Sequence, residues 1–214
     1  MNIKVSKVRV SLPGGRILFR IEKLEIPLGS KILIHGPSGQ GKTTLLHLLS
    51  GLLVSNEGSV YFNDQRLNTL DDEERSRIRR RHFGIVFQKL NLLDHLTAFE
   101  NVSLALPPSR DKKTAETVIG ALYSVNMEKF AKQRSATMSL GEQQRVAVAR
   151  VLAARPDVIL ADEPTSSLDE TNAKAIMKAL FKASEGKTFV VVSHDLRIRG
   201  DFETLIDFSE YVSQ

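Results

Sequence analysis

The sequence has 214 residues, of which 42% are hydrophobic and 26% charged, and its net charge is +5. This is the length and composition of one globular domain with a substantial core. The absence of cysteine excludes disulfides and cysteine-ligated metal sites. The most apolar stretch, 45–54, is shorter than the ~18 residues of a membrane-spanning helix, and the first residues lack the apolar run of a signal peptide. We therefore expect a chain that does not cross a membrane by itself.

The first part of the chain predicts antiparallel strands, then a buried strand and a helix. Apolar and polar residues alternate on both sides of a Pro-Gly-Gly turn at 13–15, and a second hairpin is expected at 58–67. Between these hairpins, 31–36 has the continuous apolar character of a buried strand. The segment 42–51 predicts a helix that stops at a glycine.

The densest basic cluster, 75–82, follows four acidic residues at 71–74. Acids before bases complement the helix dipole and permit i,i+4 pairs, so a solvated helix face is the favoured interpretation. A binding patch for nucleic acid or for an anionic membrane is the alternative. Because no aromatic residues interleave with the arginines to stack on bases, nucleic acid is not an expected partner.

The second half of the chain alternates strands and helices. Apolar runs at 83–88, 158–163 and 188–195 predict buried strands, and 170–186 predicts an amphipathic helix. Buried strands that alternate with helices are typical of an α/β fold, in which a parallel sheet is covered on both faces.

The segment 36–43, "GPSGQGKT", matches the phosphate-binding motif G-x-x-x-x-G-K-[ST] between an expected strand and an expected helix. Its backbone N–H groups can wrap a phosphate, and the helix N-terminus adds partial positive charge. Lys42 is expected to reach the β- and γ-phosphates of ATP, and the Thr43 hydroxyl to ligate Mg²⁺. A chance glycine-rich turn is the weaker alternative. The expected nucleotide-binding residues here are Gly36, Pro37, Ser38, Gly39, Gln40, Gly41, Lys42, Thr43 and Thr44.

Four polar residues follow buried strands and complete the expected site. Asp162 is predicted to hold Mg²⁺, and Glu163 to orient and deprotonate the attacking water. Without a P-loop, two acids leaving a strand edge into solvent would be the better interpretation. His194 would sense the γ-phosphate, although a lone histidine is more often structural. Gln88 has a neutral side chain that can touch both metal and water. The predicted metal ligands are Thr43, Gln88 and Asp162, and the predicted catalytic residues are Glu163, His194 and Gln88.

Five motifs, read in chain order, closely resemble those of the ABC transporter ATPases: the P-loop, "FQ" with Gln88, "MSLGEQQR", "VILADEPTSSLD" and "VVVSHD". The resemblance covers essentially the whole chain, and 79–106 is most like the lipoprotein-releasing, macrolide-export and cell-division branch. It implies one ATPase domain, 1–214, with a RecA-like P-loop NTPase core and an N-terminal antiparallel β region. The core would comprise 1–88 and 156–214, and an inserted helical subdomain 89–155, ending in the signature helix.

The signature helix opens with Ser139 followed by Glu142, a spacing that predicts a capping box. The resemblance implies that two copies pair head to tail. Ser139 and Gly141 would then contact ATP bound to the partner, and Asp169 would lie near the partner's P-loop. The family's usual core is Leu-Ser-Gly-Gly-Gln. Here Leu140 replaces a glycine, and the carboxylate of Glu142 should weaken closure around a polyanion unless it is turned into the cap.

The family usually places an aromatic residue ahead of the P-loop strand to stack on adenine. Here that stretch reads Ser11, Leu12 and Pro13, and the nearest aromatic residue, Phe19, is expected in the core. We expect base stacking to be weak or replaced by apolar contact with Leu12.

The resemblance implies an ATP- and Mg²⁺-dependent ATPase that works as a homodimer, or as a pseudo-dimer with a related ATPase. Its partners would be integral membrane permease subunits, which would hold it on the cytoplasmic face of the membrane. Two other classes are a soluble ABC ATPase acting on nucleic acid or ribosomes, and an ordinary P-loop kinase or GTPase. Proteins of the first class usually have two cassettes, a coiled-coil insertion or zinc-binding cysteines, none of which this sequence shows. The second class does not account for the signature helix. A permease surface and packing within the helical subdomain are equally good interpretations of Leu90, Leu92, Leu93 and Leu96.

Overall fold

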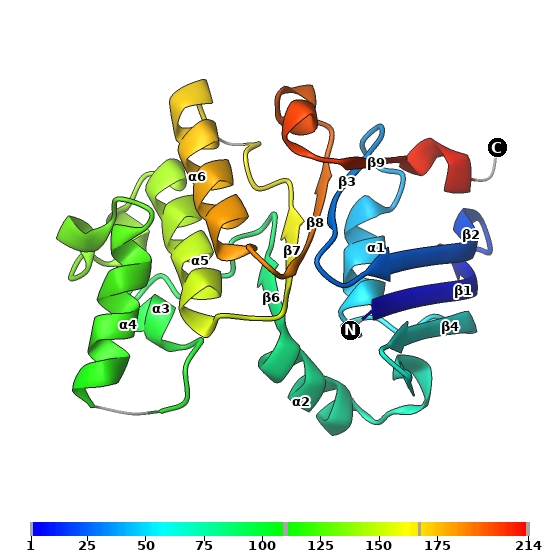
Figure 1. Cartoon of the computed structure of the whole chain (residues 1–214), viewed down its shortest axis with the longest axis horizontal. Coiled ribbons are helices and arrows are strands. Elements are labelled where there is room, and N and C mark those ends of the chain that lie inside the picture. The colour runs from blue at the N-terminus through cyan, green and yellow to red at the C-terminus, as the bar shows by residue number, and fades with distance from the viewer. Residues whose placement is uncertain (1, 109–110, 167, 213–214) are drawn as a thin grey trace. The chain divides into compact units, whose positions relative to one another are not determined.

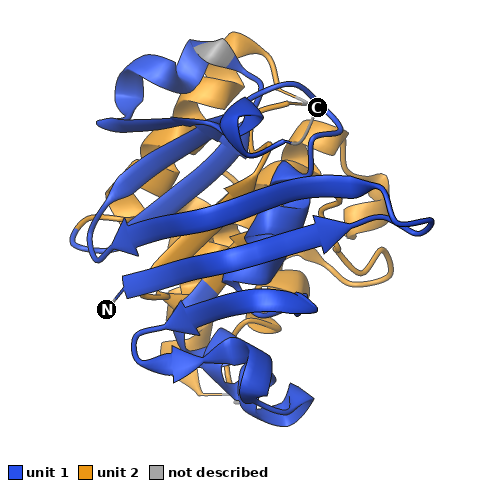
Figure 2. Ribbon diagram, turned by 90° about the vertical axis from the view of Figure 1, so that its right-hand side faces the viewer, with its two compact units in different colours: residues 1–83, 186–214 blue, residues 84–185 orange. Residues whose placement is uncertain are grey.

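The computed structural model describes residues 2–108, 111–166 and 168–212. The chain divides into two compact units, one of residues 1–83 and 186–214 and the other of residues 84–185 (Figure 2). The predicted boundaries, 1–88 with 156–214 and 89–155, come from the family resemblance rather than from the compactness of the chain, and they stay a prediction.

The first unit contains an antiparallel sheet with the strand order β2-β1-β4-β5 (Figure 1). The β1–β2 register places Ile3 opposite Ile26 and Val5 opposite Leu24, and these side chains are buried. Alternation along both strands therefore gives one buried face. The β1–β2 and β4–β5 pairs are both antiparallel, so both predicted hairpins are confirmed. The strands are β1 (Asn2–Ser11), β2 (Ile17–Pro27), β4 (Glu57–Phe62) and β5 (Gln65–Arg66).

The same unit contains three parallel strands in the order β8-β3-β9: β3 (Lys31–His35), β8 (Thr188–Ser193) and β9 (Thr204–Asp207). Every residue of β8 is buried, as expected for a strand covered on both faces. The predicted helix after the P-loop is α1 (Lys42–Leu49).

The charged segment forms α2 (Asp72–His82), capped by Asp71 and Glu74. Its arginines serve the fold: Arg79 Nη1 donates to the carbonyl oxygen of Gly51 at 2.8 Å, and Arg77 forms an exposed pair with Glu73. These contacts support the helix-face interpretation of this cluster. The remaining short helices of the unit are η1 (Leu67–Thr69), η4 (Leu196–Asp201) and η5 (Phe208–Tyr211).

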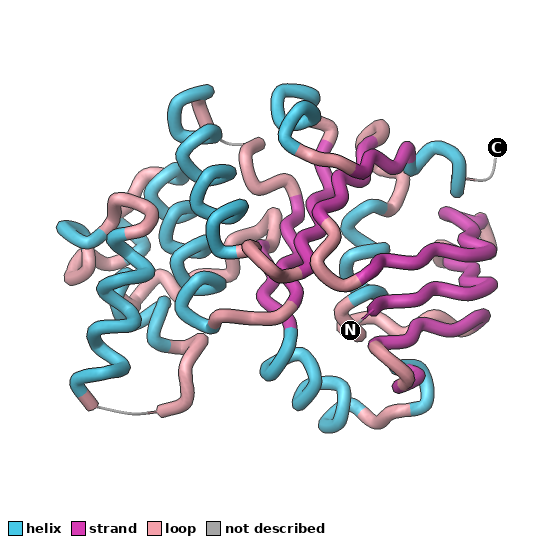
Figure 3. The backbone as a smooth tube through the Cα atoms, in the orientation of Figure 1, coloured by secondary structure: helices cyan, strands magenta, loops and turns pink. Residues whose placement is uncertain are grey.

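The second unit is mainly helical (Figure 3). Its long helix α5 packs against α3, α4 and α6, and strand β6 lies beside β7. β6 ends at Val86, so the predicted strand was two residues too long and Gln88 lies in the following loop. The elements are β6 (Phe83–Val86), whose first residue belongs to the first unit, α3 (Ala98–Ser103), α4 (Lys112–Tyr123), η2 (Glu128–Phe130), η3 (Ser135–Thr137), α5 (Leu140–Ala154), β7 (Val158–Asp162) and α6 (Glu170–Ala183).

Candidate nucleotide-binding site

The P-loop connects β3 to α1 through residues that need glycine. Gly36, Gly39 and Gly41 have φ values of 151°, 81° and 101°, a region that side chains disfavour. A Cβ atom on Gly41 would also lie 2.8 Å from side-chain atoms of Leu18 and Phe19. The close packing of the loop on β2 therefore requires glycine at this position.

Lys42 is folded back over the P-loop. Its Nζ donates to the carbonyl oxygens of Gly36 at 2.7 Å and Pro37 at 2.8 Å, and only 6% of the residue is exposed. Thr43 and Thr44 follow in the first turn of α1, which contains no acidic residue. A buried ammonium group and an acid-free helix N-terminus together favour an anion at this loop.

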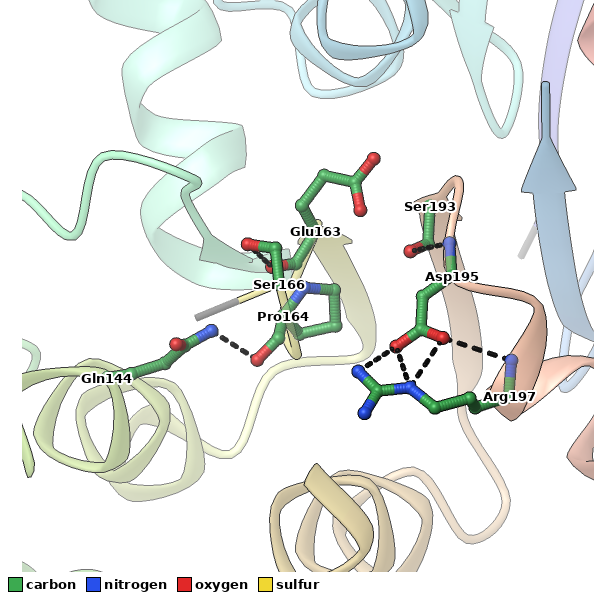
Figure 4. A network of polar contacts seen from close by, with 7 residues as sticks. All are labelled: Gln144, Glu163, Pro164, Ser166, Ser193, Asp195 and Arg197. Carbon is green, nitrogen blue, oxygen red and sulfur yellow. Dashed lines mark hydrogen bonds and ion pairs between the residues drawn. The ribbon is translucent and has the colours of Figure 1, made fainter. Parts of the chain in front are cut away.

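His194 follows the strand that is paired with the strand before the P-loop. β3 and β8 are parallel neighbours, with His35 opposite Ser193, so Gly36 and His194 both leave the carboxyl end of adjacent strands. His194 is exposed. The next residue, Asp195, caps η4 by accepting from Arg197 N at 3.0 Å, and its carboxylate also accepts from the Arg197 guanidinium at 2.7 Å (Figure 4). The chain after His194 therefore begins with a cap and an ion pair that the sequence had not predicted.

Asp162 is the last residue of β7 and Glu163 follows it, and both are buried, with 4% and 6% exposure. Glu163 has a φ of 48°, an uncommon conformation for a residue with a side chain. Ser166 stabilises it, because its N and Oγ donate to the carbonyl oxygen of Glu163 at 3.3 Å and 3.1 Å (Figure 4). The direction of the Glu163 side chain is thus set by a constrained backbone.

The predicted capping box at the start of α5 is confirmed. The Glu142 carboxylate accepts from Ser139 N at 2.8 Å and from Ser139 Oγ at 2.9 Å. These hydrogen bonds, led by the one from the backbone, lower the pKa of Glu142. The carboxylate is therefore turned into the cap, the one arrangement in which Glu142 is not expected to weaken closure around ATP. Leu140, which replaces a glycine, is 55% exposed.

Asp169 is exposed and caps α6. Its carboxylate accepts from Asn172 N at 2.9 Å and Asn172 Nδ2 at 2.6 Å, and these bonds lower its pKa. Asp169 thus remains a charged side chain at a fixed helix end.

The structure divides the predicted site residues between its units. The first unit contains the P-loop residues 36–44 and His194. The second unit contains Gln88, Ser139, Gly141, Asp162, Glu163 and Asp169. A single site that joins the two sets is a proposal.

A family model described as "ABC transporter" matches residues 20–166, a span that includes the P-loop, the signature helix and the Asp162–Glu163 pair. The chain belongs to the ABC transporter ATPase family. The ATP-binding protein MJ0796 of Methanocaldococcus jannaschii is 41% identical over 206 residues, or 90% of this chain and 86% of that protein.

Two further relatives belong to the branch suggested by the sequence. The lipoprotein-releasing system ATP-binding protein LolD of Psychrobacter arcticus is 40% identical, over 80% of this chain and 78% of its own. The macrolide export ATP-binding/permease protein MacB of Bdellovibrio bacteriovorus is 38% identical over 89% of this chain, which spans only 30% of MacB.

The fold matches solved cassettes. A dimeric, post-hydrolysis structure of MJ0796 bound to ADP and Pi has a TM-score of 0.90 and 36% sequence identity, covering 99% of this chain and 97% of the other. The predicted P-loop NTPase fold and the ATPase activity of this ABC protein are confirmed by these matches.

Proposed function

We propose that this ATPase is the energy-coupling subunit of an ABC transporter or of a related force-transmitting membrane complex, and that two copies close around two molecules of Mg·ATP. The observation that carries the proposal is the start of α5. Its capping box holds Ser139 and Glu142 in place, so the helix end is pre-organised for an anion. In a head-to-tail dimer, Ser139 and Gly141 would meet the γ-phosphate bound to the partner, and Asp169 would approach the partner's P-loop.

Residues of one copy would bind the phosphates of ATP and the magnesium ion. The P-loop and Lys42 bind the β- and γ-phosphates. The hydroxyl of Thr43, the carboxylate of Asp162 and the amide oxygen of Gln88 are the hard oxygen donors that suit Mg²⁺, which supplies charge neutralisation at the phosphates when bound. These three residues would hold the ion.

Glu163 is proposed as the general base. It accepts a proton from the water that attacks the γ-phosphorus, the bond from the γ-phosphorus to the bridging oxygen breaks, and ADP leaves with inorganic phosphate. His194 donates a hydrogen bond to a γ-phosphate oxygen. Closure is favoured by ATP because the γ-phosphate makes contacts that exist only in the closed dimer.

The leucine-rich loop after Gln88 is the proposed surface for permease subunits. Leu93 is 44% exposed, and Leu90, Leu92 and Leu96 are partly exposed. Buried Asn101 fixes this loop, because it accepts from Leu93 N at 2.8 Å and donates to the carbonyl oxygens of Leu93 and Thr97 at 3.1 Å. The partial exposure suits both the permease-surface and the internal-packing interpretations.

Membrane partners would place this ATPase on the cytoplasmic face of the membrane. None of the helices in the described part of the chain has the length and apolarity to cross a bilayer. Affinity purification from native membranes is expected to recover integral membrane subunits, whereas recovery of nucleic acid without such subunits would overturn the assignment.

The dimer is tested by Glu163→Gln. Removing the base should nearly abolish hydrolysis while leaving ATP binding intact, so a stable ATP-bound dimer should accumulate in size-exclusion chromatography with light scattering. The matched control is the same variant with Mg·ADP, which should remain monomeric. A Glu163→Gln monomer at saturating Mg·ATP would contradict the proposal.

A further inference from the structure

Three contacts join the signature helix to the segment that follows Glu163. Gln144, which is 3% exposed, donates through Nε2 to the carbonyl oxygen of Pro164 (Figure 4). One turn earlier, a Cβ atom on Gly141 would lie 3.2 Å from Leu168 Cδ2, so this glycine packs against Leu168. Arg145 Nη1 donates to Asn172 Oδ1 at 2.6 Å. All of these residues belong to the second unit.

Asn172 is the centre of this connection because it uses both ends of its amide. Its Oδ1 accepts from the Arg145 guanidinium, while its Nδ2 donates to Asp169 Oδ2 at 2.6 Å. The charges fix this orientation, since a reversed amide would put donor against donor and acceptor against acceptor. The amide accepts from a cation through its oxygen and donates to a carboxylate through its nitrogen, so one side chain joins the two charged partners.

Glu163 is connected to the same helix by the bond from Gln144. Pro164 immediately follows Glu163, whose φ of 48° is constrained. Displacement of the Pro164 carbonyl group would therefore change the backbone that aims the Glu163 carboxylate. One copy thus links its own expected base to the helix end that is expected to read the partner's γ-phosphate.

We propose that Asn172 is a positioning residue that, together with Arg145 and Gln144, makes the signature helix, Asp169 and Glu163 respond as one block. This rests on the proposed two-copy function. When the partner's P-loop holds ATP, Ser139 and Gly141 of this copy contact it and the signature helix of this copy moves. The block passes that movement to Asp169 and Glu163 of this copy. The two ATP sites are coupled by this route.

The test is the ATP dependence of hydrolysis for Asn172→Leu, which removes both amide contacts. We expect the Hill coefficient to fall from about 2, the number of sites, to about 1, because Asp169 no longer follows the signature helix. The Gln144–Pro164 bond next to Glu163 is intact in this variant, so kcat should fall by less than about tenfold. Binding of a fluorescent ATP analogue to dilute, monomeric protein should stay within about twofold, because Asn172 is not in the binding machinery. Arg145→Met should lower the Hill coefficient in the same way. The double variant with Asn172→Leu should lower it no further than either single variant, since both changes interrupt one connection.

Two further variants keep the test decisive. Asn172→Asp retains an acceptor for Arg145 but repels Asp169, so it addresses the connection even if Asn172→Leu folds poorly. Lys174→Ala is the matched control, since it removes the exposed 2.6 Å pair with Glu170 on the same helix and should leave the Hill coefficient unchanged. Cooperative wild-type protein with equally cooperative Asn172 variants would overturn this inference alone. Wild-type turnover that is independent of enzyme concentration would overturn the proposed dimer and, with it, the inference.

Discussion

Arg150 of α5 holds the loop that contains Leu90, because its Nη2 donates to the Leu90 carbonyl oxygen at 2.8 Å. Its Nη1 donates to the next carbonyl oxygen, that of Asn91, at 2.7 Å. Burial lowers the pKa of Arg150, but a guanidinium group stays charged. The helix that begins at Ser139 therefore also positions the loop that follows Gln88.

Replacing Arg150 should loosen that loop. Arg150→Met removes two hydrogen bonds from a charged donor to the Leu90 and Asn91 carbonyl groups, and we expect a loss of about 1.5–3 kcal/mol in the free energy of unfolding. Arg150→Lys should recover only part of it, because an ammonium group lacks the planar fork. Denaturant unfolding measures the loss. The control Arg77→Met removes an exposed pair and should change stability by less than about 1 kcal/mol; equal losses for the two sites would contradict this role.

The capping box predicts a pH dependence. Hydrogen bonds from Ser139 lower the pKa of Glu142 in the folded state, so the cap contributes stability above the unfolded pKa of about 4.3. That contribution is lost as the pH falls through the lower, folded pKa. The unfolding free energies of wild type and Glu142→Gln should therefore differ most near neutrality and converge in acid. A difference that grows below pH ~4 would show the opposite sign.

The same variant answers the question raised by the sequence about closure. Because the Glu142 carboxylate is occupied by Ser139, its charge is compensated at the helix N-terminus. We expect Glu142→Gln to change the concentration of Mg·ATP needed for dimerisation by less than about twofold, well below the tenfold that 1.4 kcal/mol represents. A much larger gain would mean that the charge opposes closure despite the cap.

Nucleotide affinity should respond to the turn between β1 and β2. Leu12 is 41% exposed there, while Phe19 is fully buried in the core. An aromatic side chain at position 12 would supply stacking of about 1–3 kcal/mol per base. Leu12→Tyr should therefore tighten ATP binding by about fivefold or more, measured by calorimetry with the hydrolysis-deficient Glu163→Gln background. Leu12→Met is the size-matched control, and equal affinities for the Tyr and Met variants would show that the base lies elsewhere.

Lys42 should be needed for binding itself. Its buried Nζ lies on the Gly36 and Pro37 carbonyl groups, where it is poised for the phosphates. Lys42→Ala should reduce ATP affinity by at least about tenfold, since a charged hydrogen bond contributes about 1.5–3 kcal/mol. Equilibrium dialysis measures this, with exposed Lys174→Ala as the control. Unchanged affinity with lost turnover would assign Lys42 to catalysis alone.

Local patterns in the sequence predicted local structure well. The P-loop turn, the α1 helix and the Ser139–Glu142 box each depend on residues a few positions apart, so their spacing is visible in the chain. The end of β6 was missed because Phe87 continues the apolar run, and such a run indicates burial rather than strand pairing.

Long-range contacts were not predictable in this way. Arg150 meets Leu90 across 60 positions, and Arg145 meets Asn172 across 27. Neither pair has a spacing that any helix or strand period would select. Their partners also include backbone carbonyl groups, which have no residue signature at all. The residues that position the site were therefore found only in the structure.

The central claim is that one copy cannot complete hydrolysis and takes the signature helix of a second. The most direct measurement is ATPase activity per molecule as the protein is diluted, and again when copies are fixed to a surface too sparsely to meet. We predict that specific activity falls steeply on dilution and is nearly absent on the sparse surface, with full nucleotide binding retained. Full turnover by isolated copies would contradict the account.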